Sequence, residues 1–252
     1  MIDLHAHLIP GLDDGARDLD ESVAIARAMA ADGVRVVAAT PHVRADYPTT
    51  PAAMESGLAA VRAALDEAGV ELVVLGGGEV ALAWLAGLDE DALTRFAIGG
   101  SRTLLLEPPD AGWDPALPRT LARLRQAGWR PVLAHPERNH EVQERPELLD
   151  EVIAAGALVQ LTAAAVDGRL GRRPADTARG LLRERRAHLL ASDAHAPGVR
   201  EAGLGAAVRA IGDDALGRWL TVEVPTALLA DADPPPRPPA GGPRRRWWPR
   251  RG

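Results

Sequence analysis

The chain has 252 residues, a formal net charge of −6 at pH 7 and no cysteine. Hydrophobic residues make up 46% of it, which is enough apolar mass for a globular core. The absence of cysteine excludes disulfides, thiolate metal sites and every enzyme that depends on a cysteine nucleophile. Any metal ion must therefore be held by His, Asp and Glu side chains, which suits Mn, Fe, Zn or Mg.

Charge is distributed unevenly along the chain. All 29 basic residues are Arg, and six of them lie in residues 234–252, which contain no acidic residue. The rest of the chain is therefore more acidic than the whole, and we expect no specific binding of nucleic acid. We predict one domain over residues 1–230 and a disordered, basic tail rich in Pro, Arg and Trp over residues 231–252. The Arg and Trp side chains of this tail would allow contact with anionic surfaces.

Signals for membrane targeting are absent from the sequence. Its first residues lack the basic start and apolar stretch of a signal peptide. The longest apolar stretch, residues 72–88, contains Glu79 and three consecutive glycines and is too short to span a bilayer. We expect a cytoplasmic protein without a transmembrane segment.

Short apolar runs alternate with longer segments of helical spacing. The runs are rich in Val and Leu, as is typical of buried parallel strands, and cover residues 2–5, 34–39, 71–75, 103–106, 131–134, 157–161 and 188–191. Helices are predicted over residues 20–32, 51–68, 115–127, 146–155, 174–186, 200–211 and 213–220. Strands that alternate with helices in this way favour an α/β fold with a parallel sheet closed into a barrel.

Histidines and carboxylates stand at the ends of six of the seven predicted strands. In a barrel these ends meet on one face, where such folds place their active sites. The residues are His5, His7, Asp14, His42, Glu79, Glu107, His135, Asp193 and His195. Imidazole and carboxylate groups without sulfur suit borderline divalent ions, and nine groups exceed what one ion needs. The sequence therefore predicts two or three ions that share a bridging carboxylate.

Three further features support a site at these ends. His5 and His7 are two residues apart on a strand, so both imidazoles can face the same side. Arg138 and Arg200 lie on loops that leave the ligand-bearing ends. The planar guanidinium fork of Arg suits phosphate oxygens, so these two residues are candidates for phosphate binding.

The motifs resemble the PHP (polymerase and histidinol phosphatase) superfamily, and within it the bacterial metal-dependent tyrosine phosphatases of capsule and exopolysaccharide gene clusters. The resemblance rests on HAHLIPGLDDG at residues 5–15, TPH at 40–42, GE at 78–79, LEPP at 106–109, AHPER at 134–138 and SDAH at 192–195. It covers residues 1 to about 200 and does not extend to the tail.

The resemblance implies a distorted (β/α)7 TIM-like barrel of the PHP type with a trinuclear metal site. It assigns His5, His7 and Asp193 to one ion; Glu79 as a bridge to a second ion held by Glu107 and His135; and Asp14, His42 and His195 to the third. It also implies that Arg138 and Arg200 bind the phosphate.

We therefore predict metal-dependent hydrolysis of phosphomonoesters, preferentially protein phosphotyrosine, by a metal-activated hydroxide. Manganese is the first choice of metal, with iron or zinc as alternatives. His42 or Asp13 is a candidate to protonate the leaving oxygen. The expected partners are a phosphotyrosine protein and a bacterial tyrosine kinase, in the regulation of exopolysaccharide or capsule synthesis.

Two alternatives stay open at this point. One is a phosphatase of small molecules such as histidinol phosphate, from the same superfamily. The other is a noncatalytic regulator that binds metal, which the complete set of nine ligands argues against.

Overall fold

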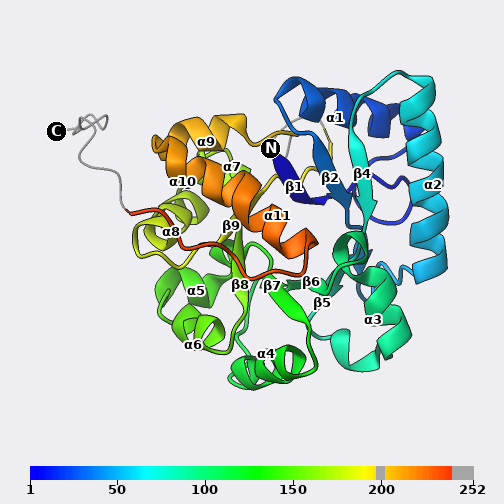
Figure 1. Ribbon diagram of the computed structural model, residues 1–252. Coiled ribbons are helices and arrows are strands. Elements are labelled where there is room, and N and C mark those ends of the chain that lie inside the picture. Colours follow the sequence, from blue (N-terminus) through cyan, green and yellow to red (C-terminus); the bar gives the residue numbers. More distant parts are fainter. Residues whose placement is uncertain (197–201, 240–252) are drawn as a thin grey trace.

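The computed structural model describes residues 1–196 and 202–239 of the chain (Figure 1). Its strands are β1 (Ile2–Ala6), β2 (Val36–Ala39), β3 (His42–Val43), β4 (Val73–Gly76), β5 (Glu79–Ala81), β6 (Thr103–Glu107), β7 (Arg130–Leu133), β8 (Leu158–Thr162) and β9 (Leu189–Ala191). Its helices are α1 (Leu19–Ala31), α2 (Pro51–Glu67), α3 (Glu90–Phe96), α4 (Leu117–Gln126), α5 (His140–Glu144), α6 (Leu148–Ala154), α7 (Ala163–Val166), α8 (Arg172–Arg183), α9 (Gly205–Ile211), α10 (Asp214–Arg218) and α11 (Val224–Leu229).

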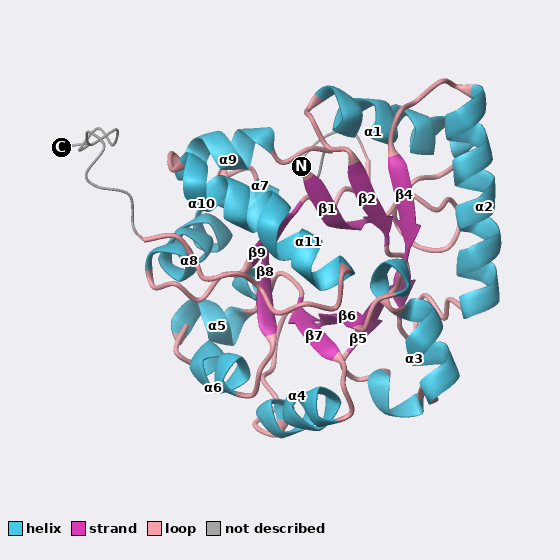
Figure 2. Cartoon of the chain, viewed as in Figure 1, coloured by secondary structure: helices cyan, strands magenta, loops and turns pink. Residues whose placement is uncertain are grey.

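The strands pair in parallel, in the orders β1-β2-β4 and β3-β5-β6-β7-β8-β9. At the far edge, the residues after β9 return to β1. His7 N donates to Ala194 O at 2.8 Å, and Asp193 N donates to His5 O at 2.9 Å. The result is a curled parallel sheet with helices around its outer side (Figures 1 and 2).

Two interruptions carry the chain from one group of strands to the other. Pro41 separates β2 from β3 and has no N–H to donate to a neighbouring strand. Gly77 and Gly78 separate β4 from β5, and a Cβ at Gly78 would lie 2.7 Å from a ring carbon of the buried Phe96. Only glycine therefore lets the backbone pack this closely against Phe96.

The local sequence explains most of the regular elements. All five residues of β6 are buried, as expected of a strand covered on both faces. The side chain of Asp18 caps α1 by accepting a hydrogen bond from Glu21 N, and Thr50 caps α2, whose first residue is Pro51. None of the helices in the described ranges is both long enough and apolar enough to traverse a bilayer.

The seven predicted strands and the five long helices between them lie within a few residues of the observed elements. The sequence did not predict β3 and β5, because runs of two and three residues show no periodicity. It also missed α3, α5, α7 and α11. The predicted helix over 200–211 is described from Gly205 onward, since residues 197–201 lie outside the described part.

Residues 231–239, which we call the terminal strap, lie against the body of the protein. The expected disorder from residue 231 is therefore wrong for this segment. Trp219 Nε1 donates to a strap carbonyl at 2.9 Å, and the Arg237 guanidinium donates to two backbone carbonyls near the end of α8, both at 2.8 Å. Composition did not reveal this, because the acceptors lie on distant segments. Residues 240–252, with most of the basic tail, lie outside the described residues.

Candidate metal centre

The carboxyl ends of the strands bring the nine predicted ligand residues together. Eight of them are buried, whereas the side chain of Asp14, in the loop after β1, is 39% exposed. The nine are His5, His7, Asp14, His42, Glu79, Glu107, His135, Asp193 and His195. Burial of so many ionisable groups is costly unless they pair with one another or bind ions.

The ligand atoms form four overlapping groups, and within each group they lie within 4.8 Å of one another. The groups are His5, His7 and Asp193; His7, Asp14, His42 and His195; His5, Glu79 and His135; and His42, Glu79 and Glu107. The first two contain the sets expected for two of the ions. Glu107 and His135, which were expected on one ion, fall in separate groups that share Glu79. Overlap of this kind is what a centre with several ions and bridging ligands requires.

Two imidazoles are oriented by hydrogen bonds on their outer nitrogen. His5 Nδ1 lies 2.9 Å from Gln160 Oε1, and His7 Nδ1 lies 2.7 Å from Asp13 Oδ2. Because both partners are oxygen acceptors, each Nδ1 donates its proton and each Nε2 is left to face the centre. The two Nε2 atoms are 3.2 Å apart, an arrangement that suits two ligands of one cation.

The electrostatics of the cluster favour positive charge between its members. Burial lowers the pKa of His7, but hydrogen bonds with the surrounding carboxylates, that of Asp13 first, hold this pKa well above 6.5. Burial raises the pKa of Glu79, while the charge of His5 and the hydrogen bond from His135 hold it well below 4.5. The carboxylates therefore stay ionised and need cations beside them, which protons or metal ions can supply.

Glu79 gives the most direct indication that a metal ion fits here. Its Oε1 lies 2.8 Å from His135 Nε2, whereas its buried Oε2 has no hydrogen-bond partner. This Oε2 lies 2.8 Å from His42 Nδ1 and 3.2 Å from His5 Nε2. A divalent cation would supply the partner that this oxygen lacks. A donor set of nitrogen and oxygen without sulfur fits manganese, iron or zinc.

Two of the ligand residues have an unusual backbone conformation. His135 follows β7 with φ of 31°, and Asp193 follows β9 with φ of 52°. Both values lie in the left-handed region, which costs a histidine about 1 kcal/mol or more. Strain of this kind persists only where the surrounding structure maintains it, and it concentrates at functional sites.

Arg138 borders the cluster, as the sequence predicted. Its Nη1 lies 3.2 Å from Asp193 Oδ2, and its Nη2 lies 3.6 Å from Asp110 Oδ1. The side chain is 25% exposed, so it is open to solvent beside a buried ligand. Arg200, the second predicted phosphate-binding residue, lies outside the described residues.

The sequence analysis missed two residues that support the site and gave a third a different role. Arg44 Nη1 lies 3.1 and 3.2 Å from the two oxygens of Glu107, and its position two residues after His42 was the available signal. Gln160 was visible only as a polar residue within an apolar run. Asp13 was noted as a proton donor, not as the partner of His7.

Asp13 is unsuited to donate a proton to a leaving group. Its side chain accepts hydrogen bonds from His7 Nδ1 and from the backbone N–H groups of Gly15 and His42. Burial raises its pKa, but these hydrogen bonds and the charge of His7 lower it to about 2. The carboxylate therefore acts as an ionised acceptor that fixes His7 and the start of β3.

Comparison with known proteins places the chain among bacterial phosphatases. It is 32% identical to the tyrosine-protein phosphatase YwqE of Bacillus subtilis strain 168 over 198 residues, which are 77% of each chain. It is 28% identical to the putative tyrosine-protein phosphatase CapC of Staphylococcus aureus over 200 residues, again 77% of each.

A solved structure shows that the similarity extends to the fold. The match comes from crystal structures of YwqE from Bacillus subtilis and CpsB from Streptococcus pneumoniae, described as unique metal-dependent tyrosine phosphatases. The TM-score is 0.84 at 30% sequence identity, over 96% of this chain and 100% of the other. The CpsB/CapC family of capsular polysaccharide synthesis matches residues 1–222, so the chain belongs to this family.

Proposed function

We propose that this protein hydrolyses phosphomonoesters, preferentially phosphotyrosine in a protein substrate. The observation that supports this best is the set of four overlapping ligand groups beside the partly exposed guanidinium of Arg138. Relatives named tyrosine-protein phosphatases match most of the chain. A role in the control of capsule or exopolysaccharide synthesis fits the family to which it belongs.

The nine ligand residues would hold two or three divalent ions, with manganese first and iron or zinc as alternatives. When bound, such ions supply Lewis acidity at the phosphoryl group and lower the pKa of a water that attacks phosphorus. The protein contributes the orientation of the ligands, through Gln160 behind His5 and Asp13 behind His7. It also keeps the carboxylates ionised in a buried site.

The arginines would bind the phosphoryl oxygens and balance their charge. Arg138 lies beside Asp193, so its guanidinium can reach an oxygen of a phosphate next to that ligand. Arg200 is proposed for the same role from the sequence. Because both ring nitrogens of His42 face carboxylates, at 2.8 Å from Glu79 and 3.4 Å from Asp14, we assign it as a ligand before a proton donor.

We also infer the complete barrel and the organisation around it. With β2 and β3, and β4 and β5, each counted as one interrupted strand, the sheet has the seven positions of a distorted (β/α)7 barrel. This unit would span residues 1–230 and act in the cytoplasm on a phosphotyrosine protein, with a bacterial tyrosine kinase as a partner. The basic tail beyond the terminal strap remains a candidate for contact with anionic surfaces.

Comparison of substrates tests the proposed function. The purified protein, supplied with Mn²⁺, should hydrolyse a phosphotyrosine peptide with a higher kcat/KM than histidinol phosphate. The reverse order would favour the small-molecule phosphatase. Absence of turnover on both substrates and on p-nitrophenyl phosphate would favour a noncatalytic metal-binding regulator.

A further inference from the structure

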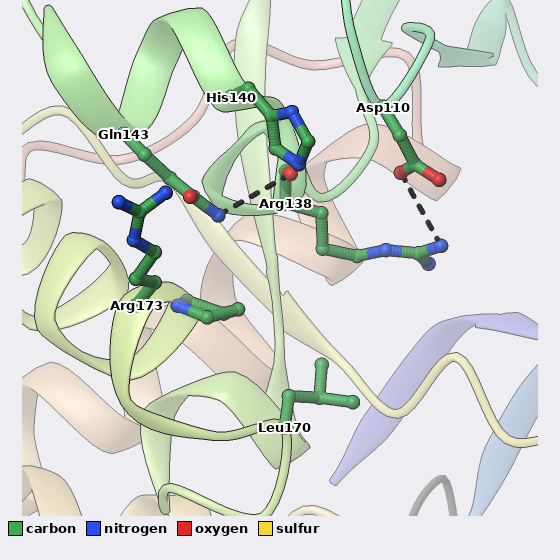
Figure 3. Close-up of a pocket in the computed structure, with 7 residues that line it drawn as sticks. Asp110, Arg138, His140, Gln143, Leu170 and Arg173 are labelled. Carbon is green, nitrogen blue, oxygen red and sulfur yellow. Dashed lines mark hydrogen bonds and ion pairs between the residues drawn. The ribbon is translucent and has the colours of Figure 1, made fainter.

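A recess of about 360 Å³ lies beside the metal centre, between α5 and the start of α8 (Figure 3). Its lining comes from the loop after β6, the turn after β7, α5, the loop between α7 and α8, and the first turn of α8. The residues that matter here are Asp110, Arg138, His140, Gln143, Leu170 and Arg173. Of these residues, the proposed reaction uses only Arg138.

The recess is open to an anionic group. It is lined by two guanidinium groups, those of Arg138 and Arg173, and by one carboxylate, that of Asp110. Asp110 is 68% exposed and lies 3.6 Å from Arg138. Among the residues that the structure describes, Arg173 has no hydrogen bond and no ion pair. An uncompensated cation at the edge of a recess can pair with an anion from outside.

Arg138 connects the recess with the metal centre. One end of its guanidinium lies 3.2 Å from Asp193 Oδ2, and the other lies 3.6 Å from Asp110, which lines the recess. A phosphate bound by this guanidinium therefore lies next to the recess. Residues of an extended peptide rise about 3.3 Å each, so side chains one or two positions from the phosphotyrosine come within reach of it.

Hydrogen bonds fix the wall of the recess in place. His140 N donates to Asp110 O at 2.9 Å, and Asn139 Nδ2 donates to Pro109 O at 2.8 Å. Gln143 Nε2 donates to the carbonyl of Glu137 at 2.9 Å. A preformed wall lowers the ordering cost of binding, as ligand sites generally do.

We propose that this recess binds a carboxylate side chain of the substrate that is close in sequence to the phosphotyrosine, with Arg173 as its main partner. The proposal rests on the proposed function and specifies its substrate class, namely phosphotyrosine peptides with a flanking Glu or Asp. Leu170 would contact the methylene groups of that side chain. The site makes substrate choice depend on charge outside the reacting group.

Two peptides that differ only in a Glu or a Gln beside the phosphotyrosine test the proposal. The wild-type protein should favour the Glu peptide by about two- to fivefold in kcat/KM, mainly through KM, as expected for one accessible ion pair. Arg173→Ala should bring this ratio close to one. Added salt should lower the wild-type ratio as well, because it screens the pair.

Arg172→Ala is the matched control, since Arg172 is the preceding residue, is 94% exposed and pairs with Asp176 outside the recess. It should retain the wild-type ratio. A Glu/Gln ratio of one in the wild type, or an equal loss of this ratio in both variants, would overturn the proposal for the recess. Hydrolysis of the peptides would still support the proposed function. If neither peptide nor p-nitrophenyl phosphate is hydrolysed, the proposed function itself fails, and the recess proposal fails with it.

Discussion

Two histidines of the same protein, His7 and His188, show how neighbours determine what a buried imidazole can do. His7 lies among carboxylates, and its pKa stands well above 6.5. His188 lies just before β9, where burial and the positive charge of Arg237 lower its pKa to about 4. The first environment attracts cations, whereas the second repels them. Burial alone therefore does not mark a histidine as a metal ligand.

The surroundings of His188 are structural. Its Nδ1 accepts a hydrogen bond from Val159 N at 3.1 Å, and its ring lies 6.4 Å from that of Trp219. Trp219 donates a hydrogen bond to the terminal strap, and Arg237 of the strap donates to carbonyls of the body, so both residues attach the strap. The region around His188 stabilises the fold. The strand ends around His7, in contrast, concentrate charged groups at some cost to stability.

Substitution of a strand-end histidine should have the largest effect. His135→Asn suits the left-handed backbone of this position better than alanine does, so it removes the imidazole with little added strain. We expect turnover of p-nitrophenyl phosphate to fall by at least about 100-fold, with loss of bound metal. His188→Asn, the control, should retain turnover. Equal turnover rates for His135→Asn and the wild type would show that His135 is not part of the metal centre.

Asp13→Asn should have the next largest effect, since it changes the group that orients His7. Metal affinity and activity should fall by about 10- to 100-fold, measured as the dependence of turnover on Mn²⁺ concentration. Asp18→Asn provides the control, because asparagine is also a good helix cap and Asp18 is an exposed residue that belongs to none of the four ligand groups. An unchanged Mn²⁺ dependence for Asp13→Asn would show that the hydrogen bond to His7 has no role in metal binding.

Arg237→Ala should affect stability and not chemistry. The loss of hydrogen bonds to two carbonyls should lower the free energy of unfolding by about 2 kcal/mol, measured by urea titration. Arg218→Ala, an exposed residue paired with Glu223, should change it by less than about 0.5 kcal/mol. Similar stabilities of the two variants would mean that the strap contributes little to the fold.

The pH dependence of stability should show the smallest effect. Because the pKa of His188 is about 4 in the folded protein and near 6.5 in the unfolded chain, the unfolded state gains a proton first as the pH falls. Stability is therefore lost from pH 6.5 downward. Between about pH 7.5 and about pH 5.5 the wild type should lose about 1 kcal/mol more than His188→Asn. Parallel pH profiles of the two proteins would contradict the lowered pKa.

The sequence predicted the residues of the candidate site better than the hydrogen bonds that link distant segments around it. Apolar strands are visible as runs, and a polar residue at the end of a run stands out, which is why His135 and Asp193 could be located. Gln160 could not be assigned a role, because its partner His5 is 155 residues away. The terminal strap was missed for the same reason, since Arg237 bonds to carbonyls that only the folded chain brings near.

The short strands β3 and β5 show a different limit of prediction from sequence. β3 and β5 follow Pro41 and two glycines, which sequence rules associate with turns, yet they carry His42 and Glu79 into the cluster. The motifs there identified the residues, but the close packing of Gly78 against Phe96 is visible only in the folded chain.

Metal analysis of the purified protein, combined with phosphotyrosine turnover, tests the central claim most directly. The protein should contain two or three divalent ions per chain, lose turnover when they are removed, and regain it when Mn²⁺ is restored. Treatment with a thiol-alkylating reagent should change nothing, because the chain has no cysteine. Full turnover by protein shown to be free of metal would contradict the account.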